Sequence, residues 1–216
     1  MEDFAVIQTH VIVPRRRADI VTRPRLIQLL KDQLDRKLVI VAAPAGYGKT
    51  SLLIDFARQS EFPTCWYTLD PLDNDLQRFL AHFLAALEER FPRFGRNSWA
   101  ALQALGKGQL DVTAFVTTLV NEAYQHISEH FLFVLDDYHL VAENEQINAF
   151  LNRFVQDVDE NCHLIIASRS LLTLPDLPLL VARNQVSGLS FAELAFDAQE
   201  ISALFSQNYQ LSLSDE

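Results

Sequence analysis

Cysteine is scarce in this sequence: the 216 residues contain only Cys65 and Cys162. Both lie in apolar, strand-like segments, so we interpret them as small core residues and expect a cytoplasmic protein. No apolar run approaches the ~20 residues needed to span a membrane. The acidic start of the chain, residues 1–4, lacks the basic-then-apolar layout of a secretory signal. These absences exclude a secreted disulfide scaffold and predict no membrane association.

Basic residues are also in deficit, with 18 Lys and Arg against 28 Asp and Glu, for a net charge of −10. An acidic surface repels phosphate backbones, so we expect no DNA contact by these residues themselves. A nucleotide pocket remains compatible with this charge because its positive potential is local. The length suits one α/β domain of ordinary size.

Only six glycines occur, and two of them, Gly46 and Gly48, fall between an apolar stretch (residues 38–42) and Lys49-Thr50. This order of strand, glycine-containing loop, Lys-Thr and apolar helix is typical of a phosphate-binding P-loop. Small residues let the loop turn its amides toward phosphate oxygens. Lys49 is then placed for the terminal phosphates and Thr50 for Mg²⁺. The first glycine of the strict pattern is Ala43 here, and a glycine turn that merely precedes Lys-Thr is the alternative.

A second motif is the apolar run 131–135, which ends in Asp136 and Asp137. A continuous run of this kind predicts a strand buried on both faces of a parallel sheet. Carboxylates at its C-terminal tip lie where ligands bind in such sheets. A simple Asp turn is the alternative, but beside a P-loop the pair indicates a Mg²⁺ site.

The remaining patterns alternate strands with helices, which predicts a three-layer α/β fold with a mostly parallel central sheet flanked by helices. We expect strands at 64–69, 131–137 and 162–168, helical faces within 26–34, 76–87, 112–127 and 147–158, a capped helix after Asp197, a loop-rich bridge at 97–108 and an irregular segment or short helix at 171–180. The triplet Arg15-Arg16-Arg17 is interpreted as a solvated surface run rather than an anion site. The predicted division is an N-terminal segment and helix (1–36), a core that carries the P-loop (37–196) and a C-terminal stretch (197–216). The family resemblance described next implies that the core is a P-loop ATPase and that the C-terminal stretch is the start of a helical lid or winged-helix region.

Five stretches together resemble the ATPase domain of MalT-type signal-transduction ATPases with numerous domains (STAND). They are AlaProAlaGlyTyrGlyLysThr, ValLeuAspAspTyrHis, IleIleAlaSerArg, IleValThrArgProArgLeu and AsnAspLeuGlnArgPheLeu. The resemblance extends from about Val13 to Ser214 and implies an ASCE-type P-loop NTPase fold. It also implies a molecular switch that rests with ADP, exchanges it for ATP to self-associate, and hydrolyses ATP slowly with Mg²⁺.

The output of such a switch is implied by the resemblance alone. Many relatives are LuxR-type transcription regulators that bind DNA through a C-terminal module absent from these residues. The alternative is a STAND-type ATPase attached to a non-transcriptional effector in signalling or conflict. A nucleotide-free scaffold whose P-loop is only structural is a further possibility from another class.

The resemblance also implies roles for individual residues. The loop backbone at Ala45, Gly46, Tyr47 and Gly48 would cradle phosphates, with Lys49 as the phosphate lysine and Ser51 at the α-phosphate. Thr50 and Asp136 would be at Mg²⁺, and Asp137 would position water. Arg169 would sense the γ-phosphate, and Arg23 would lie near the base and ribose. In this class, the strand before Arg169 lies between the P-loop strand and the Asp-bearing strand.

The end of the sequence suggests an excised core. Ser214-Asp215-Glu216 has the composition of a helix N-cap and first turn. We therefore expect these residues to bind nucleotide, turn it over very slowly, remain monomeric and ignore any inducer.

Overall fold

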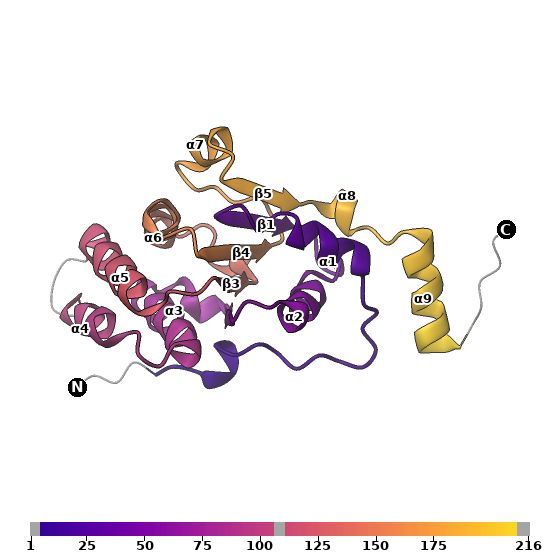
Figure 1. The fold of residues 1–216 in the computed structure, drawn as a ribbon, viewed down its shortest axis with the longest axis horizontal. Helices are drawn as coiled ribbons and strands as arrows, with labels where there is room; N and C mark the ends of the chain where they lie inside the picture. The colour runs from indigo at the N-terminus through magenta and orange to yellow at the C-terminus, as the bar shows by residue number, and fades with distance from the viewer. Residues whose placement is uncertain (1–4, 106–110, 211–216) are drawn as a thin grey trace.

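A five-stranded parallel sheet forms the centre of the computed structural model, which describes residues 5–105 and 111–210 (Figure 1). The strand order is β2-β3-β4-β1-β5, and every neighbouring pair is parallel. The strands are β1 (Leu38–Ala42), β2 (Thr64–Thr68), β3 (Phe131–Asp136), β4 (Cys162–Ser168) and β5 (Val186–Leu189). The predicted α/β fold class is confirmed, and β4 lies between β1 and β3 as expected.

The connections between strands are mainly helical. The α-helices are α1 (Pro24–Lys31), α2 (Lys49–Gln59), α3 (Leu76–Arg90), α4 (Arg96–Leu105), α5 (Val112–His126), α6 (Glu145–Asp157), α7 (Leu177–Ala182), α8 (Phe191–Leu194) and α9 (Ala198–Tyr209). Within the described residues, the short 3-10 turns are η1 (Gln8–His10), η2 (Pro71–Asn74) and η3 (Tyr138–Leu140). No helix in the described ranges is long and apolar enough to cross a bilayer.

Two hydrophobic clusters, one on each face of the sheet, give the molecule its three layers. Alternate residues of β3 supply them: Phe133 and Leu135 pack with α3 to α6, whereas Leu132 and Val134 pack with α1 and α2. The alternation follows from the two-residue period of a strand. Both cysteines are free and buried in this core, as expected.

The segment predicted as a loop-rich bridge is instead largely helical. Helix α4 starts at Arg96, just after Gly95, whose φ of +111° favours glycine. Its first amides are capped from outside: the buried Glu122 carboxylate of α5 accepts hydrogen bonds from the backbone of Asn97 and Ser98, each at 2.8 Å. The sequence prediction was wrong because this cap comes from a residue more than twenty positions away.

Strand β5 and helix α8 were also missed. β5 has four residues, and only Leu189 among them is fully buried, so no strand pattern stands out. Gly188 is needed there, because a Cβ at this position would lie 2.3 Å from the Ile40 carbonyl oxygen. Residues 171–180, predicted to be irregular or a short helix, lead into the short helix α7. The first helix is shorter than its pattern, because α1 ends before Leu34.

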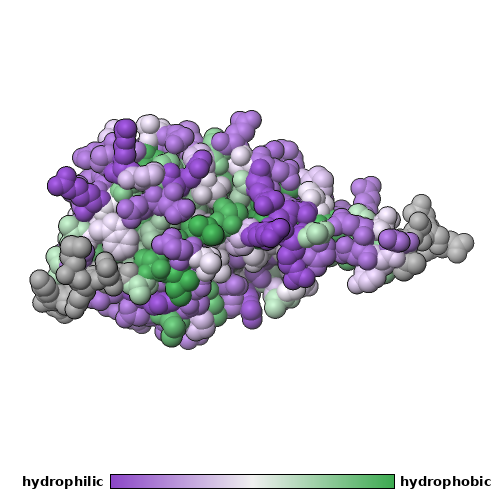
Figure 2. Space-filling view, turned by 90° about the horizontal axis from the view of Figure 1, so that it is seen from below, coloured by the Kyte–Doolittle hydropathy of each residue, from purple (hydrophilic) through white to green (hydrophobic). Residues whose placement is uncertain are grey.

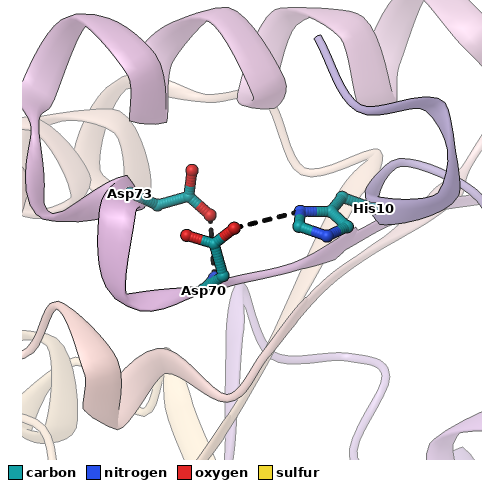
Figure 3. Close-up of side chains that lie close together, drawn as sticks. All are labelled: His10, Asp70 and Asp73. Atoms are coloured by element: carbon teal, nitrogen blue, oxygen red, sulfur yellow. Dashed lines mark hydrogen bonds and ion pairs between the residues drawn. The ribbon is translucent and has the colours of Figure 1, made fainter.

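The N-terminal segment crosses the body before α1 (Figure 1). It is tied down near the end of β2, where His10 Nδ1 lies 3.8 Å from Asp70 (Figure 3). Asp70 and Asp73 could reach a metal ion together with His10. However, Arg78 already pairs with both carboxylates, at 3.2 and 2.8 Å. We therefore treat this cluster as a structural ion-pair network.

Helix α9 projects from the body as an arm (Figures 1 and 2). It begins with the predicted capping box, in which Asp197 accepts from the Glu200 amide and Glu200 accepts from the Asp197 amide. Ile201 on this helix remains exposed. Figure 2 shows a largely hydrophilic arm beside a body whose viewed face carries hydrophobic groups near its middle. The helix start predicted at 214–216 lies outside the described residues.

The α4 cap yields a stability prediction. Burial alone would raise the pKa of Glu122, but hydrogen bonds from Ser98 and the Asn97 amide outweigh burial and lower it. Its contribution is therefore present above the ordinary pKa of 4.5 and lost as pH falls through the lowered value. We expect Glu122→Gln to cost about 1–3 kcal/mol at neutral pH and to increase hydrogen exchange selectively in α4.

The control for this prediction is Glu129→Gln, at an exposed position just after the same helix. Denaturant unfolding and amide exchange measure the two variants side by side. Equal stability of both variants, or loosening spread evenly over the chain, would contradict the capping role.

Candidate functional site

The candidate site lies at the C-terminal edge of the sheet, where β1, β4 and β3 end side by side. Because the strands are parallel, the loops that follow them emerge at the same edge. The loop after β1 turns at Gly46 and Gly48, with φ of +89° and +74°. Nothing lies within 4 Å of where either Cβ would be, so the backbone conformation, and not crowding, requires glycine at both positions. The loop leads directly into the N-terminus of α2, the positive end of its dipole.

Lys49 is the first residue of α2 and is 8% exposed. Its Nζ donates to the carbonyl oxygens of Ala43 at 2.7 Å and Pro44 at 3.1 Å. Burial lowers the pKa of Lys49, whereas the charges of Asp137 and Asp136 counteract that decrease. The ammonium group is thus held inside the loop by two neutral acceptors, which an anionic phosphate would replace with a stronger partner.

Asp136 ends β3 and is 1% exposed. Its Oδ1 accepts from the Asp137 amide at 3.0 Å, but its buried Oδ2 has no hydrogen-bond partner in the described residues. Burial raises the pKa of Asp136 to about 6, and the Asp137 charge adds to the rise. The Thr50 hydroxyl and the Lys49 charge oppose it. A buried carboxylate oxygen without a partner is costly and marks a place for a cation.

The residues present fit Mg²⁺. The Asp136 carboxylate, with its unpartnered Oδ2, and the Thr50 hydroxyl lie close enough to interact, and both supply the hard oxygen donors that Mg²⁺ prefers. Mg²⁺ takes only one or two protein oxygens when phosphates complete its shell.

Asp137 and Arg169 face the same edge. Asp137 adopts a left-handed backbone conformation (φ 58°), which turns the chain away from β3 into η3. Its carboxylate is 38% exposed and lies 3.7 Å from His139 Nδ1. Arg169 follows β4, is exposed, and lies near enough to lower the pKa of both Lys49 and His139. The structure thus brings the predicted catalytic and metal residues together.

A cavity of about 140 Å³ lies beside the loop. The P-loop side contributes Gly46, Gly48 and Ser51. The opposite walls come from the segment before α1, from the residues that lead into α9 and from α9 itself, and they include Ile20, Val21, Arg23, Phe196 and Leu204. A second hollow of about 270 Å³ shares Gly46 and Phe196 and also involves Ala45 and Tyr47. The apolar walls next to a phosphate loop suit a nucleobase.

Arg23 lines this cavity, but its guanidinium is engaged elsewhere. It donates to the Leu194 and Ala195 carbonyl oxygens at 2.9 Å each and to Glu200 Oε2 at 2.7 Å. Its charge also lies 4.3 Å above the Phe196 ring. Arg23 therefore joins the cavity wall to α9, and any contact with a base or ribose remains a prediction.

The interpretation of the arginine triplet as a solvated surface run is wrong for Arg16. Its side chain pairs with the buried Asp55 of α2 and donates to the Ile20 carbonyl oxygen at 2.8 Å. Arg17 pairs with exposed Asp19, as a surface residue does. Arg16 thereby holds the cavity-lining segment against the P-loop helix. Its acidic partner is 39 positions away, and no local pattern indicates the pair.

Taken together, the nucleotide-binding loop, the parallel sheet and the acidic strand end define a P-loop ATPase domain. Its fold is similar to that of a solved Walker-type ATPase from Pyrococcus abyssi, with a TM-score of 0.51, 14% identity, and coverage of 90% of this chain and 59% of that one. That likeness concerns the fold alone.

The chain is also homologous to MalT regulators. It is 34% identical over 198 residues to the HTH-type transcriptional regulator MalT of Yersinia enterocolitica and 33% identical over 195 residues to that of Yersinia pestis. In both comparisons the match covers 89% of this chain but only 21% of the regulator. No protein-family model matches the chain. The resemblance to a MalT-type P-loop ATPase domain is thus confirmed.

The buried carboxylate yields the next prediction. Because the pKa of Asp136 rises on folding from its ordinary 3.8 to about 6, the folded state holds this proton more tightly. Stability of the nucleotide-free protein then increases as pH falls from about 6 to about 4, and the ionised group opposes folding at neutral pH. We expect Asp136→Asn to stabilise the nucleotide-free protein at pH 7.5 by on the order of 2 kcal/mol and to remove Mg²⁺-dependent stabilisation.

Thermal unfolding at pH 5 and pH 7.5, with and without MgATP, measures both effects. The control is Asp159→Asn, an exposed residue at the opposite edge of the sheet. If Asp136→Asn lowers stability at pH 7.5, or keeps the Mg²⁺ response, the assignment of Asp136 as a buried metal ligand is wrong.

Proposed function

We propose that this chain is the ATP- and ADP-binding switch module of a MalT-type transcription regulator. The observation that carries the proposal is the convergence of Lys49, Thr50, Asp136, Asp137 and Arg169 at one edge of the sheet. The homology to MalT regulators supports the regulatory setting. The proposal includes a cytoplasmic location. It also includes DNA binding through a different part of the regulator.

Each residue has a defined task in the proposed mechanism. The loop amides and Lys49 bind the β- and γ-phosphates, and Ser51 lies at the α-phosphate. Thr50 and Asp136 hold Mg²⁺, which neutralises phosphate charge when bound. Asp137 orients the attacking water for slow hydrolysis.

Exchange is the controlling step of the switch. Arg169 gains a partner only when a γ-phosphate is present, so its interaction energy differs between the ATP and ADP states. The Arg23–Glu200 pair places α9 against the nucleotide cavity, so a change in the cavity is transmitted to the arm. We infer that ATP binding releases a surface for self-association in a MalT-type regulator, and that these 216 residues by themselves are monomeric.

Nucleotide binding itself is tested at Lys49. Lys49→Met keeps the apolar stem that packs in the loop but removes the charge. Loss of one charge-assisted contact predicts about 10- to 100-fold weaker MgATP and MgADP binding, with an unchanged circular dichroism spectrum. Calorimetric titration measures the affinity, and Lys31→Met, an exposed position on α1, is the control. Unaltered affinity in folded Lys49→Met would exclude the P-loop as the phosphate site.

The switch itself is tested at Arg169. Arg169→Ala should weaken ATP binding about tenfold, the cost of one charged hydrogen bond, while ADP affinity stays the same. The matched control is Arg183→Ala, an exposed arginine next to β5 at the other end of the sheet. A parallel loss of ADP affinity would mean that Arg169 is structural and does not discriminate between the two nucleotides.

A further inference from the structure

A second cavity, of about 490 Å³, lies at the edge of the sheet opposite the P-loop. The cavity beside the P-loop measures about 140 Å³, and none of the residues that line the larger one belongs to the proposed nucleotide site. Its walls come from the segments around the starts of β1, β4 and β5, and His130 is added from the segment before β3. Because all these strands are parallel, their starts lie at one edge of the sheet.

Backbone pairing within the sheet fixes where the lining residues lie. The Lys37 carbonyl oxygen accepts from the Leu164 amide at 3.0 Å, and the Gln185 carbonyl oxygen accepts from the Leu38 amide at 3.1 Å. His163 is the second residue of β4 and lies next to Leu164. The starts of β4, β1 and β5 are therefore aligned, and the cavity is formed by the ends of paired strands.

The cavity walls carry a local surplus of positive charge, although the net charge of the chain is −10. Three cations, Arg36, Lys37 and Arg183, line the cavity together with two acids, Asp35 and Glu160. Asp35 is already paired with Arg36, at 2.6 Å. Glu160 is exposed to solvent, which screens its charge. The lining therefore has a surplus of one positive charge while its histidines are neutral.

Two of the cations have no acidic partner at ion-pair distance in the part of the chain that the structure describes. Lys37 is half-buried, and its Nζ donates to main-chain carbonyl oxygens, the nearer being that of Val158 at 2.8 Å. Lys49 is held by main-chain carbonyl oxygens in the same way in the P-loop. Arg183 caps the C-terminal end of α7 and is exposed. An anion would give both charges a stronger partner than a neutral carbonyl or water.

Two histidines are joined in the cavity wall. His130 Nδ1 and His163 Nε2 lie 3.0 Å apart, and the ring centroids lie 5.2 Å apart with an interplanar angle of 13°. These values fit two rings joined end to end by a hydrogen bond between their nitrogens. The Phe62 ring is nearly parallel to both, at 5.5 and 5.4 Å. His163 is 6% exposed, and its Nδ1 is buried without a hydrogen-bond partner in the described residues.

Such a pair accepts one added proton more readily than two. In the neutral pair, one of the facing nitrogens carries a hydrogen and the other accepts it. A first added proton goes to an outer nitrogen and leaves this bond intact, whereas a second would place two positive rings in contact. Burial lowers the pKa of His163 and the His130 charge lowers it further, while the nearby backbone of Arg36 and Leu34 opposes the decrease. The pair therefore adds one positive charge to the cavity as the pH falls.

We propose that this cavity binds the phosphate group of a small phosphorylated molecule, and that binding takes up one proton from solvent on the His130–His163 pair. The added proton raises the surplus charge of the lining from one to two, which matches a phosphate dianion. No covalent bond of the ligand changes. This site lies at the opposite edge of the sheet from the proposed nucleotide site, so the inference goes beyond the proposed function and does not depend on it.

The organic part of the ligand has a place next to this cavity. A hollow of about 210 Å³ shares Leu34 with it and is lined by Phe56 and Phe62. The charged residues there, Lys31 and Glu61, are of opposite sign. Apolar walls beside a cationic cavity suit a molecule that carries a phosphate on a small carbon skeleton.

Sulfate is the first probe, because it stays a dianion over the pH range in which histidine titrates, whereas phosphate takes up a proton near pH 6. Isotope-labelled wild-type protein is titrated with sodium sulfate at constant ionic strength, and NMR follows the His130 and His163 rings and the amides of residues 36–37 and 183–185. We expect saturable shifts at these positions. Because binding takes up a proton, sulfate affinity should be about three- to tenfold higher at pH 6 than at pH 7.5.

Two variants separate the fixed charge from the titrating pair. Arg183→Ala should weaken sulfate binding about tenfold at both pH values, the cost of one charged hydrogen bond. His130→Gln keeps an amide beside His163 but removes the exposed ring, so sulfate affinity should become nearly the same at pH 6 and pH 7.5. Arg93→Ala and His126→Gln, at exposed positions outside the cavity lining, are the matched controls and should behave as the wild type does.

A comparison of inorganic phosphate with glycerol 3-phosphate at pH 7.5 tests the class of ligand. The ester should bind more tightly and shift the Phe62 signals as well. Equal affinity of the two would overturn the assignment of a phosphorylated organic molecule.

The site itself is overturned if sulfate causes no saturable shifts at the cavity, or if Arg183→Ala binds sulfate as tightly as the wild type does. The role of the histidine pair is overturned if wild-type affinity does not change with pH, or if His130→Gln keeps the pH dependence. The amides of residues 43–51 report on the P-loop in the same spectra. Absence of a MgATP response there removes the proposed function and leaves this inference standing.

Discussion

The position of β4 between β1 and β3 is the constraint on which the site depends. Parallel pairing brings three strand ends to one edge, and each end contributes a different chemistry: amides and Lys49 after β1, Asp136 at the end of β3, and Arg169 after β4. None of these groups is near another in sequence. This arrangement costs folding free energy, because it buries the Asp136 carboxylate with one oxygen unpartnered. The core on both faces of the sheet offsets that cost, because β3 and β4, two of the three strands that carry the site, are buried along their whole length.

Features that depend on residues close together in the sequence were predicted from local sequence patterns. The glycines of the loop, the apolar run before Asp136 and the capping box at Asp197 each act within a few residues, and all three predictions are confirmed in the structure. Features that depend on distant partners escaped prediction. Helix α4 is capped by Glu122, β5 needs the β1 edge, and Arg16 needs Asp55. His139 belongs to the ValLeuAspAspTyrHis motif. Its proximity to Arg169 follows from the strand order and not from the sequence separation of the two residues.

The cavity wall connects the sheet edge to the rest of the chain. Arg23 and Glu200 form a buried pair, with both side chains under a tenth exposed, and Arg25 adds contacts to Asp197 and Glu200. Breaking such a pair leaves an uncompensated charge, so the approach to α9 is held firmly. Most side chains of α9 beyond that point are exposed. A helix that is held by ion pairs at its start and exposed along most of its length suits an element that responds to changes in the nucleotide cavity. The match covers about a fifth of each of these MalT regulators.

The central claim is that MgATP binds at the C-terminal edge of this sheet, between the P-loop and the approach to α9. Hydrogen–deuterium exchange with and without MgATP tests it most directly, because it locates the ligand without any substitution. The account predicts slower exchange at residues 43–51 and 194–204, with the opposite edge of the sheet, around His163, unchanged. Unchanged exchange at the loop, or protection confined to the opposite edge, would contradict the account.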